Sequence, residues 1–427
     1  MTRIEMAKKG VVTKEIEAVA MAEGISPERL ASDIAEGVTV IVGNMLHGIT
    51  PLGIGRGLRT KINANIGTSK DRVSYDDEIK KLEVLVQYGA DAVMDLSTGG
   101  AIRDLRNTLI NKSPVAVGTV PIYEAVVRTA ESHGSIIEMK PDELFDVIEE
   151  HAREGVDFVT VHCGVTRRAI ERLKEDRRIL DVVSRGGSFL LEWMIFNDKE
   201  NPLYEQYDRL LEIAKRYDLT LSLGDGFRPG CLSDATDRSQ IEELTTLGEL
   251  RDAALSENVQ TIIEGPGHVP LNQVEMNIKL EKEVCKGAPF YVLGPLVTDV
   301  AMGYDHICAA IGGAIAGAAG ADFLCYVTPA EHIRLPDMND VKEGVIASKI
   351  AAHAADIAKG VPGAMEKDNR MARCRKKLDW EGQISLSFDP QRVREWRKQV
   401  PPSVSEVCSM CGEFCAIRTV ERALNKI

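Results

Sequence analysis

The sequence lacks both a long apolar run and a cluster of basic residues. Its longest apolar stretch, 311–319, is rich in Gly and Ala and is too short to span a bilayer, and residues 1–10 contain no apolar leader. Lys and Arg number 52 against 65 Asp and Glu, which gives a formal net charge of -13. We therefore expect a cytoplasmic protein that binds neither a membrane nor nucleic acid.

Cysteine is also sparse, with nine in 427 residues, six of them scattered and three close together near the end. This distribution is unlike a disulfide framework and favours a reducing compartment. Hydrophobic residues make up 44% and charged residues 27%, proportions typical of a globular protein with a sizeable core. We expect one large catalytic domain with terminal extensions.

Eight short apolar, β-branched runs recur through the sequence, and each is followed by a helix-like segment. They cover residues 61–67, 92–99, 115–121, 158–164, 219–226, 259–267, 290–294 and 322–329. This rhythm predicts the α/β class and a (β/α)8 TIM-type barrel, with a doubly wound open sheet as the structural rival. Residues 182–190 are a candidate additional strand.

The flanking segments predict four regions. We expect an N-terminal helical extension over 1–60, in which 1–43 form two helices and a leading strand, and the catalytic barrel over 61–335. C-terminal helices and a linker follow over 336–400. A mobile terminal segment, 401–427, carries the three clustered cysteines.

Polar side chains end most of the predicted strands, and a barrel active site forms where its strands end. The residues that we expect to converge there are Asn65, Asp95, Tyr123, His162, Asp225, Arg228, Glu264, His268, Asp299 and His332. His268 and His332 are placed to share a metal, although a hydrogen-bonded histidine pair is the simpler interpretation. Ser184-Arg185-Gly186-Gly187 and Arg228 suit a phosphate or carboxylate, with a plain Asp225–Arg228 ion pair as the alternative.

Cys408, Cys411 and Cys415 place three thiols within eight residues, close enough to hold one inorganic centre. Three thiolates on a [4Fe–4S] cluster leave one iron open, which is what S-adenosylmethionine (SAM) needs in order to chelate it. A structural zinc is the alternative, but it wants a fourth ligand, and no His or Cys lies in 375–407 or after Cys415.

Seven motifs together resemble the phosphomethylpyrimidine synthase (ThiC) family of radical SAM enzymes over nearly the whole chain. They lie at 63–69, 94–100, 118–123, 184–187, 264–270, 303–306 and 408–411. The resemblance implies a (β/α)8 barrel that rearranges 5-aminoimidazole ribotide through a 5′-deoxyadenosyl radical. It also implies a homodimer, with the cluster segment contributed across it, and an external electron donor such as flavodoxin or ferredoxin.

The resemblance also implies the site residues. The ribotide would contact Asn65, Met94, Tyr123, His162, Ser184, Arg185, Gly186, Asp225, Gly226, Phe227, Arg228, Glu264 and Tyr291. Glu264, Asp225 and His162 are the candidates for proton transfer, and Arg185 and Arg228 would anchor the phosphate. His268 and His332 would hold zinc or another divalent metal, and the three clustered cysteines would hold the [4Fe–4S] cluster.

Three positions depart from the family's thiamine-pathway pattern: Leu46, where Asn is usual, Phe227, where Leu is usual, and Met302, where Pro is usual. On these departures we expect 5-hydroxybenzimidazole, the lower-ligand base of anaerobic cobalamin (B12), as the product. The alternative product is 4-amino-5-hydroxymethyl-2-methylpyrimidine phosphate, the thiamine precursor. A zinc-dependent barrel lyase and a non-catalytic ribotide-binding regulator are more remote hypotheses.

Overall fold

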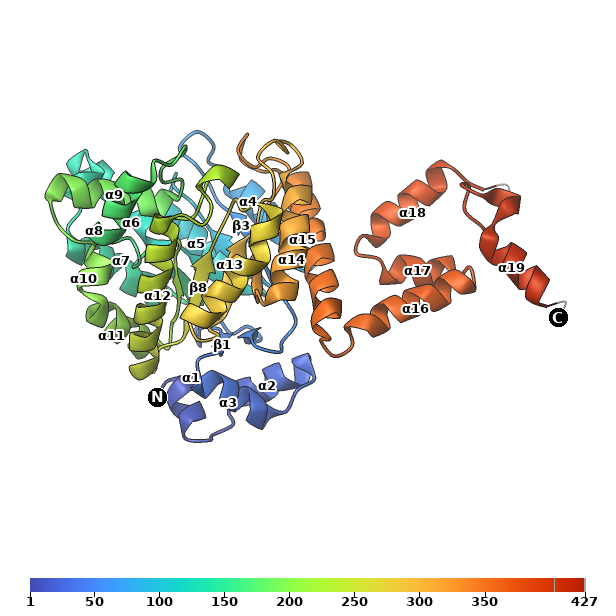
Figure 1. Ribbon diagram of the computed structural model, residues 1–427, viewed down its shortest axis with the longest axis horizontal. Coiled ribbons are helices and arrows are strands. Elements are labelled where there is room, and N and C mark those ends of the chain that lie inside the picture. Colours follow the sequence, from blue (N-terminus) through green and yellow to red (C-terminus); the bar gives the residue numbers. More distant parts are fainter. Residues whose placement is uncertain (403, 426–427) are drawn as a thin grey trace. The chain divides into compact units, whose positions relative to one another are not determined.

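The computed structural model describes residues 1–402 and 404–425 (Figure 1). Two compact units divide the chain, Met1–Lys359 and Gly360–Ile427. The larger unit contains all ten strands found in the described residues. No helix of the described part is both long and apolar enough to cross a membrane.

Eight parallel strands close into a barrel in the order β10-β3-β4-β5-β6-β7-β8-β9. They are β3 (Lys61–Ile66), β4 (Ala92–Asp95), β5 (Ala116–Thr119), β6 (Phe158–Val161), β7 (Thr220–Leu223), β8 (Thr261–Gly265), β9 (Phe290–Leu293) and β10 (Phe323–Cys325). Each lies inside one of the eight predicted runs. The predicted (β/α)8 barrel is therefore confirmed, and the open-sheet rival is wrong because β10 pairs with both β9 and β3.

Helices surround this barrel and connect its strands (Figure 1). They are α4 (Tyr75–Tyr88), α5 (Ile102–Lys112), α6 (Pro121–His133), α7 (Pro141–Glu154), α8 (Arg167–Asp176), α9 (Arg185–Asn197), α10 (Pro202–Glu205), α11 (Tyr207–Tyr217), α12 (Arg238–Ser256), α13 (Leu271–Val284), α14 (Asp305–Ala319) and α15 (Met338–Lys359), with short 3-10 turns η1 (Ile136–Glu138) and η2 (Leu232–Asp234). The candidate strand at 182–190 is wrong, because Ser184 caps α9 by accepting from the Gly187 N–H, and this favours a helix start.

Large side chains fill the barrel interior, and two glycines make room for them. The rings of Phe158 and Phe323 lie 6.2 Å apart, and a Cβ added to Gly118 would come within 2.3 Å of the Phe158 ring. A Cβ on Gly265 would come within 2.0 Å of the Phe290 ring. Glycine is therefore required at both positions, because no other residue lets the aromatic rings approach these strands so closely.

The N-terminal extension lies at the end of the barrel where the strands begin. It contains α1 (Arg3–Lys8), α2 (Lys14–Glu23), α3 (Pro27–Ala35) and an antiparallel hairpin of β1 (Thr39–Val42) and β2 (Leu52–Gly55). The amide of Gln260, just before β8, donates to the Ile41 carbonyl and accepts from the Ile41 N–H. We expected two helices in this extension, and the structure has three. The helix that the sequence did not predict is α1, which has only six residues and is too short to show a helical periodicity.

The larger unit extends beyond the expected barrel limit at residue 335. Helix α15 packs along α14 through small residues, and a Cβ added to Gly317 would come within 2.7 Å of the Ala355 methyl. The smaller unit contains α16 (Ala364–Lys376), α17 (Trp380–Leu386), α18 (Pro390–Gln399), η3 (Gly412–Phe414) and α19 (Ala416–Leu424). Of the expected terminal segment 401–427, residues 403, 426 and 427 lie outside the described residues.

Candidate active site at the barrel mouth

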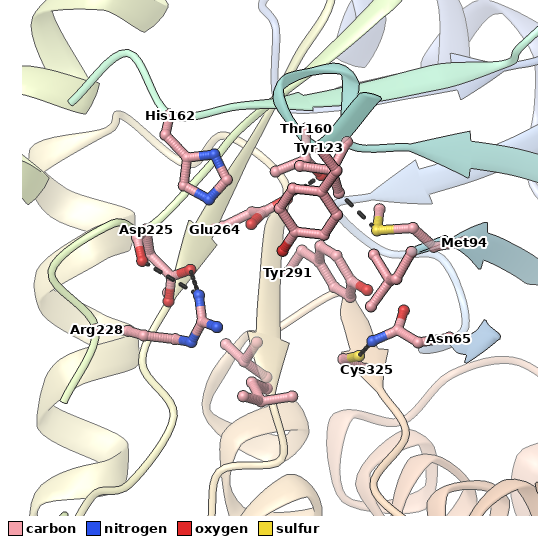
Figure 2. Close-up of a pocket in the computed structure, with 15 residues that line it drawn as sticks. Asn65, Met94, Tyr123, Thr160, His162, Asp225, Arg228, Glu264, Tyr291 and Cys325 are labelled. Atoms are coloured by element: carbon pink, nitrogen blue, oxygen red, sulfur yellow. Dashed lines mark hydrogen bonds and ion pairs between the residues drawn. The ribbon is translucent and has the colours of Figure 1, made fainter. Parts of the chain in front are cut away.

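A cavity of about 90 Å³ opens at the carboxyl ends of the barrel strands (Figure 2). Eight of the residues predicted to contact the ribotide line it: Asn65, Met94, Tyr123, His162, Asp225, Arg228, Glu264 and Tyr291. They come from strands or loops on every side of the barrel, so the convergence follows from the closed sheet. Asp95 does not line this cavity, because it turns back to accept from the N–H and the hydroxyl of Ser97.

The two sides of the cavity differ in charge. Figure 2 shows Asp225 and Arg228 together on one side, while Asn65, Met94 and Cys325 lie on the other. Arg228 Nη1 donates to Asp225 Oδ1 at 3.2 Å, and Asn65 Nδ2 lies 3.1 Å from the Cys325 sulfur. A ligand with a charged end and a neutral heterocyclic end fits this division.

Glu264 lies between these sides and is held by hydroxyl groups on β6 and β7. Thr160 Oγ1 and Ser222 Oγ donate to Glu264 Oε1 at 2.7 and 2.6 Å. Burial raises the pKa of Glu264, while these two hydroxyls and the Arg228 charge oppose that rise. The carboxyl group is therefore buried, oriented and able to exchange a proton.

Asp225 and His162 each carry a buried polar atom without a hydrogen-bond partner in the described structure, Asp225 Oδ2 and His162 Nδ1. Burial raises the pKa of Asp225 to about 7, although Arg228 lowers it. Burial and the Arg228 charge lower the pKa of His162 to about 3, so its imidazole is neutral at physiological pH. Unsatisfied buried groups are costly, and a ligand in this cavity would satisfy them.

The N-terminus of α9 lies directly behind His162. Ser184 Oγ lies 3.2 Å from His162 Nε2, and a Cβ on Gly186 would come within 2.3 Å of the same ring. The Arg185 guanidinium lies 5.0 Å from the centre of the Tyr123 ring. These three predicted residues therefore contact residues that line the first cavity, and Arg185 itself lines an adjoining cavity of about 380 Å³.

Gly226 and Phe227 lie one layer further out. Their backbone N–H groups donate to Glu243 Oε1 and Oε2 at 2.7 and 2.8 Å, and the Phe227 side chain is fully buried. Neither residue lines the cavity, and their contact with the ribotide stays a prediction. Their place in the fold is to hold the Asp225–Arg228 loop against Glu243.

The predicted metal pair, His268 and His332, lies beside the mouth with the ring centroids 5.4 Å apart. His268 Nδ1 is 2.8 Å from Asp299 Oδ1, which leaves His268 Nε2 free, and His332 Nδ1 is 4.0 Å from Asp305. Two imidazoles with a carboxylate behind one of them fit a zinc-type centre. Within the described residues, no three His, Cys, Asp or Glu side chains surround one metal position.

The three clustered cysteines lie in the smaller unit, around η3. All three are free thiols, Cys411 is exposed, and Cys408 and Cys415 are half-buried. Backbone N–H groups of Cys411 and Met410 lower the pKa of Cys408, which favours the thiolate. Three free thiols that solvent can reach, one of them in a turn that favours its thiolate form, are suited to hold a [4Fe–4S] cluster.

The three residues that depart from the thiamine-pathway pattern, Leu46, Phe227 and Met302, do not surround one pocket. Leu46 lies in the β1–β2 connection, where the neighbouring Asn44 donates to the Ala152 and Val156 carbonyls at the opposite end of the barrel. Phe227 is buried behind its loop, and Met302 is exposed in the loop between β9 and α14. Sequence distance alone did not reveal which barrel end each loop occupies.

Sequence reasoning missed the residues beneath the strand ends. Thr160, Ser222 and Cys325 line or support the cavity, and Asn63 Nδ2 donates to the Tyr291 hydroxyl at 2.6 Å. The sequence does contain a pattern that would have found Thr160 and Asn63, because side chains two residues apart on a strand lie on the same face. Thr160 precedes His162 by that spacing, and Asn63 precedes Asn65. Glu243, which is on α12, has no such signal.

The chain is similar to known proteins along its full length. The family model described as "Radical SAM ThiC family" matches residues 2–422. A protein of Thermodesulfovibrio yellowstonii named phosphomethylpyrimidine synthase is 65% identical over 99% of this chain and 100% of its own. One of the same name from Geobacter metallireducens is 58% identical over 100% and 98%. A dihydropteroate synthase structure from Coxiella burnetii aligns with 72% of this chain and 96% of its own, at 12% identity and a TM-score of 0.42.

Proposed function

The chain belongs to the radical SAM ThiC family, and from that premise we propose that it is a phosphomethylpyrimidine synthase. In this proposal it converts 5-aminoimidazole ribotide into 4-amino-5-hydroxymethyl-2-methylpyrimidine phosphate for thiamine biosynthesis. The support is the name shared by relatives that are 58–65% identical over essentially the whole chain. Membership of a radical SAM family makes the chain an enzyme that uses SAM and a [4Fe–4S] cluster.

The expected 5-hydroxybenzimidazole product is not supported and gives way to the alternative. Of the three departures on which it depended, Leu46 lies at the far end of the barrel, and the Phe227 side chain does not line the cavity. Eight of the residues that the family resemblance assigned to the ribotide do line the cavity. A zinc-dependent lyase without a cluster is also set aside by membership of a radical SAM family.

A ribotide fits the division of charge in the cavity. Arg228 Nη1 donates to one carboxylate oxygen and the backbone carbonyl of Asp225, and Arg185 lies over Tyr123 at the start of α9. A helix N-terminus with an Arg at its first position suits a phosphate group. Asn65 and Tyr291 offer amide and hydroxyl groups to the heterocycle from the neutral side.

Proton transfers in the rearrangement are assigned to three groups. Glu264 and Asp225 have raised pKa values that bring them toward neutral pH, and His162 is neutral with Nδ1 unpaired. Each is therefore suited to accept or donate a proton at a reacting atom.

Cofactor binding is proposed for two further residue sets. Cys408, Cys411 and Cys415 would hold the [4Fe–4S] cluster, which together with SAM supplies the radical that removes hydrogen from the substrate. His268 and His332 would hold zinc or another divalent ion beside the mouth. A homodimer and an external electron donor such as flavodoxin or ferredoxin complete the proposal.

Anaerobic incubation with a reductant, SAM and the ribotide, followed by mass spectrometry, tests this function. We expect the pyrimidine phosphate and 5′-deoxyadenosine. Appearance of 5-hydroxybenzimidazole would transfer the assignment to the cobalamin branch, and no consumption of ribotide would overturn it. Glu264→Gln is expected to retain ribotide binding by calorimetry while losing turnover.

A further inference from the structure

Two hydroxyl groups hold Glu264, and neither belongs to the predicted site. Thr160 lies on β6, Ser222 on β7 and Glu264 on β8, three strands that are adjacent in the barrel. Thr160 and Ser222 are direct partners in the β6–β7 register. The two hydroxyls therefore approach Glu264 from its own side of the barrel interior, and both end at Oε1, at 2.7 and 2.6 Å.

The Thr160 hydroxyl has no competing acceptor at hydrogen-bond distance among the described residues. The nearest other acceptor of the Thr160 hydroxyl is the Met94 sulfur at 4.0 Å, which is too distant to draw its proton from Glu264. Ser222 is fully buried, and Thr160 is nearly so. Hydrogen bonds from buried neutral donors to a carboxylate are among the stronger ones in proteins, so this arrangement fixes the orientation of the carboxyl group.

We propose that Thr160 and Ser222 are positioning residues that occupy one oxygen of Glu264 and thereby direct the other, Oε2, toward the substrate. The inference rests on the proposed function, in which Glu264 transfers a proton. With Oε1 held by two donors, the carboxylate has little freedom to rotate, which leaves Oε2 for a bound molecule. The Asp225 backbone N–H is a further donor that faces this carboxylate, and none of the variants below removes it. The hydroxyls also favour the carboxylate over the acid, so they oppose the rise that burial causes in the pKa of Glu264.

The variants that test this proposal are Thr160→Val, Ser222→Ala and the double substitution, with Thr160→Ser and Ser222→Thr retaining a hydroxyl. Thr220→Val is the matched control. It removes another buried hydroxyl of β7, one that accepts from Gln260 at the opposite end of the strand. A merely structural role would make Thr220→Val resemble Ser222→Ala.

The decisive readout is the acid limb of the pH profile of kcat/KM. The charged and titratable groups that face Glu264 are Asp225, Arg228, Tyr123 and Tyr291. All of them are unchanged in these variants. Because the two hydroxyls lower the pKa of Glu264, removing them raises that pKa. As the pH falls, the carboxylate is then protonated sooner, so the acid limb of the profile moves to a higher pH. We expect a shift of about one pH unit for each hydroxyl removed, and recovery in Thr160→Ser and Ser222→Thr.

Infrared difference spectroscopy separates this inference from the proposed function. The protonated-carboxyl band that disappears in Glu264→Gln can be titrated whether or not ribotide is consumed. We expect its midpoint to move upward in the double variant and to stay in place in Thr220→Val. An unmoved midpoint would overturn the positioning role even if the wild-type protein makes the pyrimidine, and a moved midpoint in a protein that consumes no ribotide would overturn the function alone.

Discussion

Replacing Gly186 with Ala is expected to disable the site while leaving the barrel folded. The added Cβ would lie 2.3 Å from Cε1, 2.5 Å from Nδ1 and 2.9 Å from Nε2 of His162. Non-bonded carbon atoms prefer about 3.5–4.0 Å, so the ring or the start of α9 must retreat by about 1 Å. The ring has little freedom, because it is buried and the His162 carbonyl is tied to the Asn201 amide at 2.8 Å.

The size of the effect follows from that displacement. Overpacking of a rigid core costs about 1–3 kcal/mol, and a misplacement of about 1 Å in an active site costs about 100-fold in rate. Gly317→Ala is the matched control, because its Cβ would come within 2.7 Å of Ala355 in the α14–α15 contact, away from the cavity. Thermal melting and kcat/KM for ribotide turnover check both variants.

We expect a similar loss of melting temperature in the two variants, but a loss of turnover in Gly186→Ala alone. The reasoning is refuted if Gly186→Ala retains more than half of the wild-type kcat/KM. It is also refuted if Gly317→Ala loses activity to the same extent, because overpacking anywhere in the barrel would then explain the result.

Three further outcomes follow from charge and ligation. Burial, with no hydrogen-bond partner among the described residues, raises the pKa of Glu281 to about 8. The contribution of this group to stability is therefore fully present below pH 4.5 and is lost as the pH rises through about 8. In Glu281→Gln the melting temperature should decline less over this range, and parallel pH curves for the two proteins would contradict this prediction. Asp299→Asn should weaken zinc binding by about 10–100-fold in chelator competition, because it loses the carboxylate that orients His268; unchanged affinity would remove Asp299 from the metal site. Cys411→Ser should abolish the iron content and the cluster absorbance after anaerobic reconstitution. The control is Cys374→Ser, which removes a half-buried thiol of the same unit and should retain both. Iron retained in Cys411→Ser would exclude Cys411 as a ligand.

The barrel was predictable because its strands are short apolar runs with clear ends. Strand-end residues such as Asn65, His162 and Glu264 followed directly from that pattern, because parallel strands present their carboxyl ends at one rim. The start of α9 was not predictable from periodicity, since Ser184 and two glycines precede its apolar residues and are equally common in turns. The support from Glu243 was also hidden, because it depends on how α12 packs back against the loop that follows β7, which the sequence pattern does not show.

The three positions that depart from the thiamine-pathway pattern do not act on the product through one common pocket. Leu46, Phe227 and Met302 all lie in family motifs, yet the closed barrel separates them between its two ends and puts Phe227 behind the loop that Glu243 holds. Phe227 is next to Asp225 and Arg228 in the chain but does not itself line the cavity. The relatives that are 58–65% identical over essentially the whole chain are named phosphomethylpyrimidine synthase, and this is what favours the pyrimidine product as the proposal.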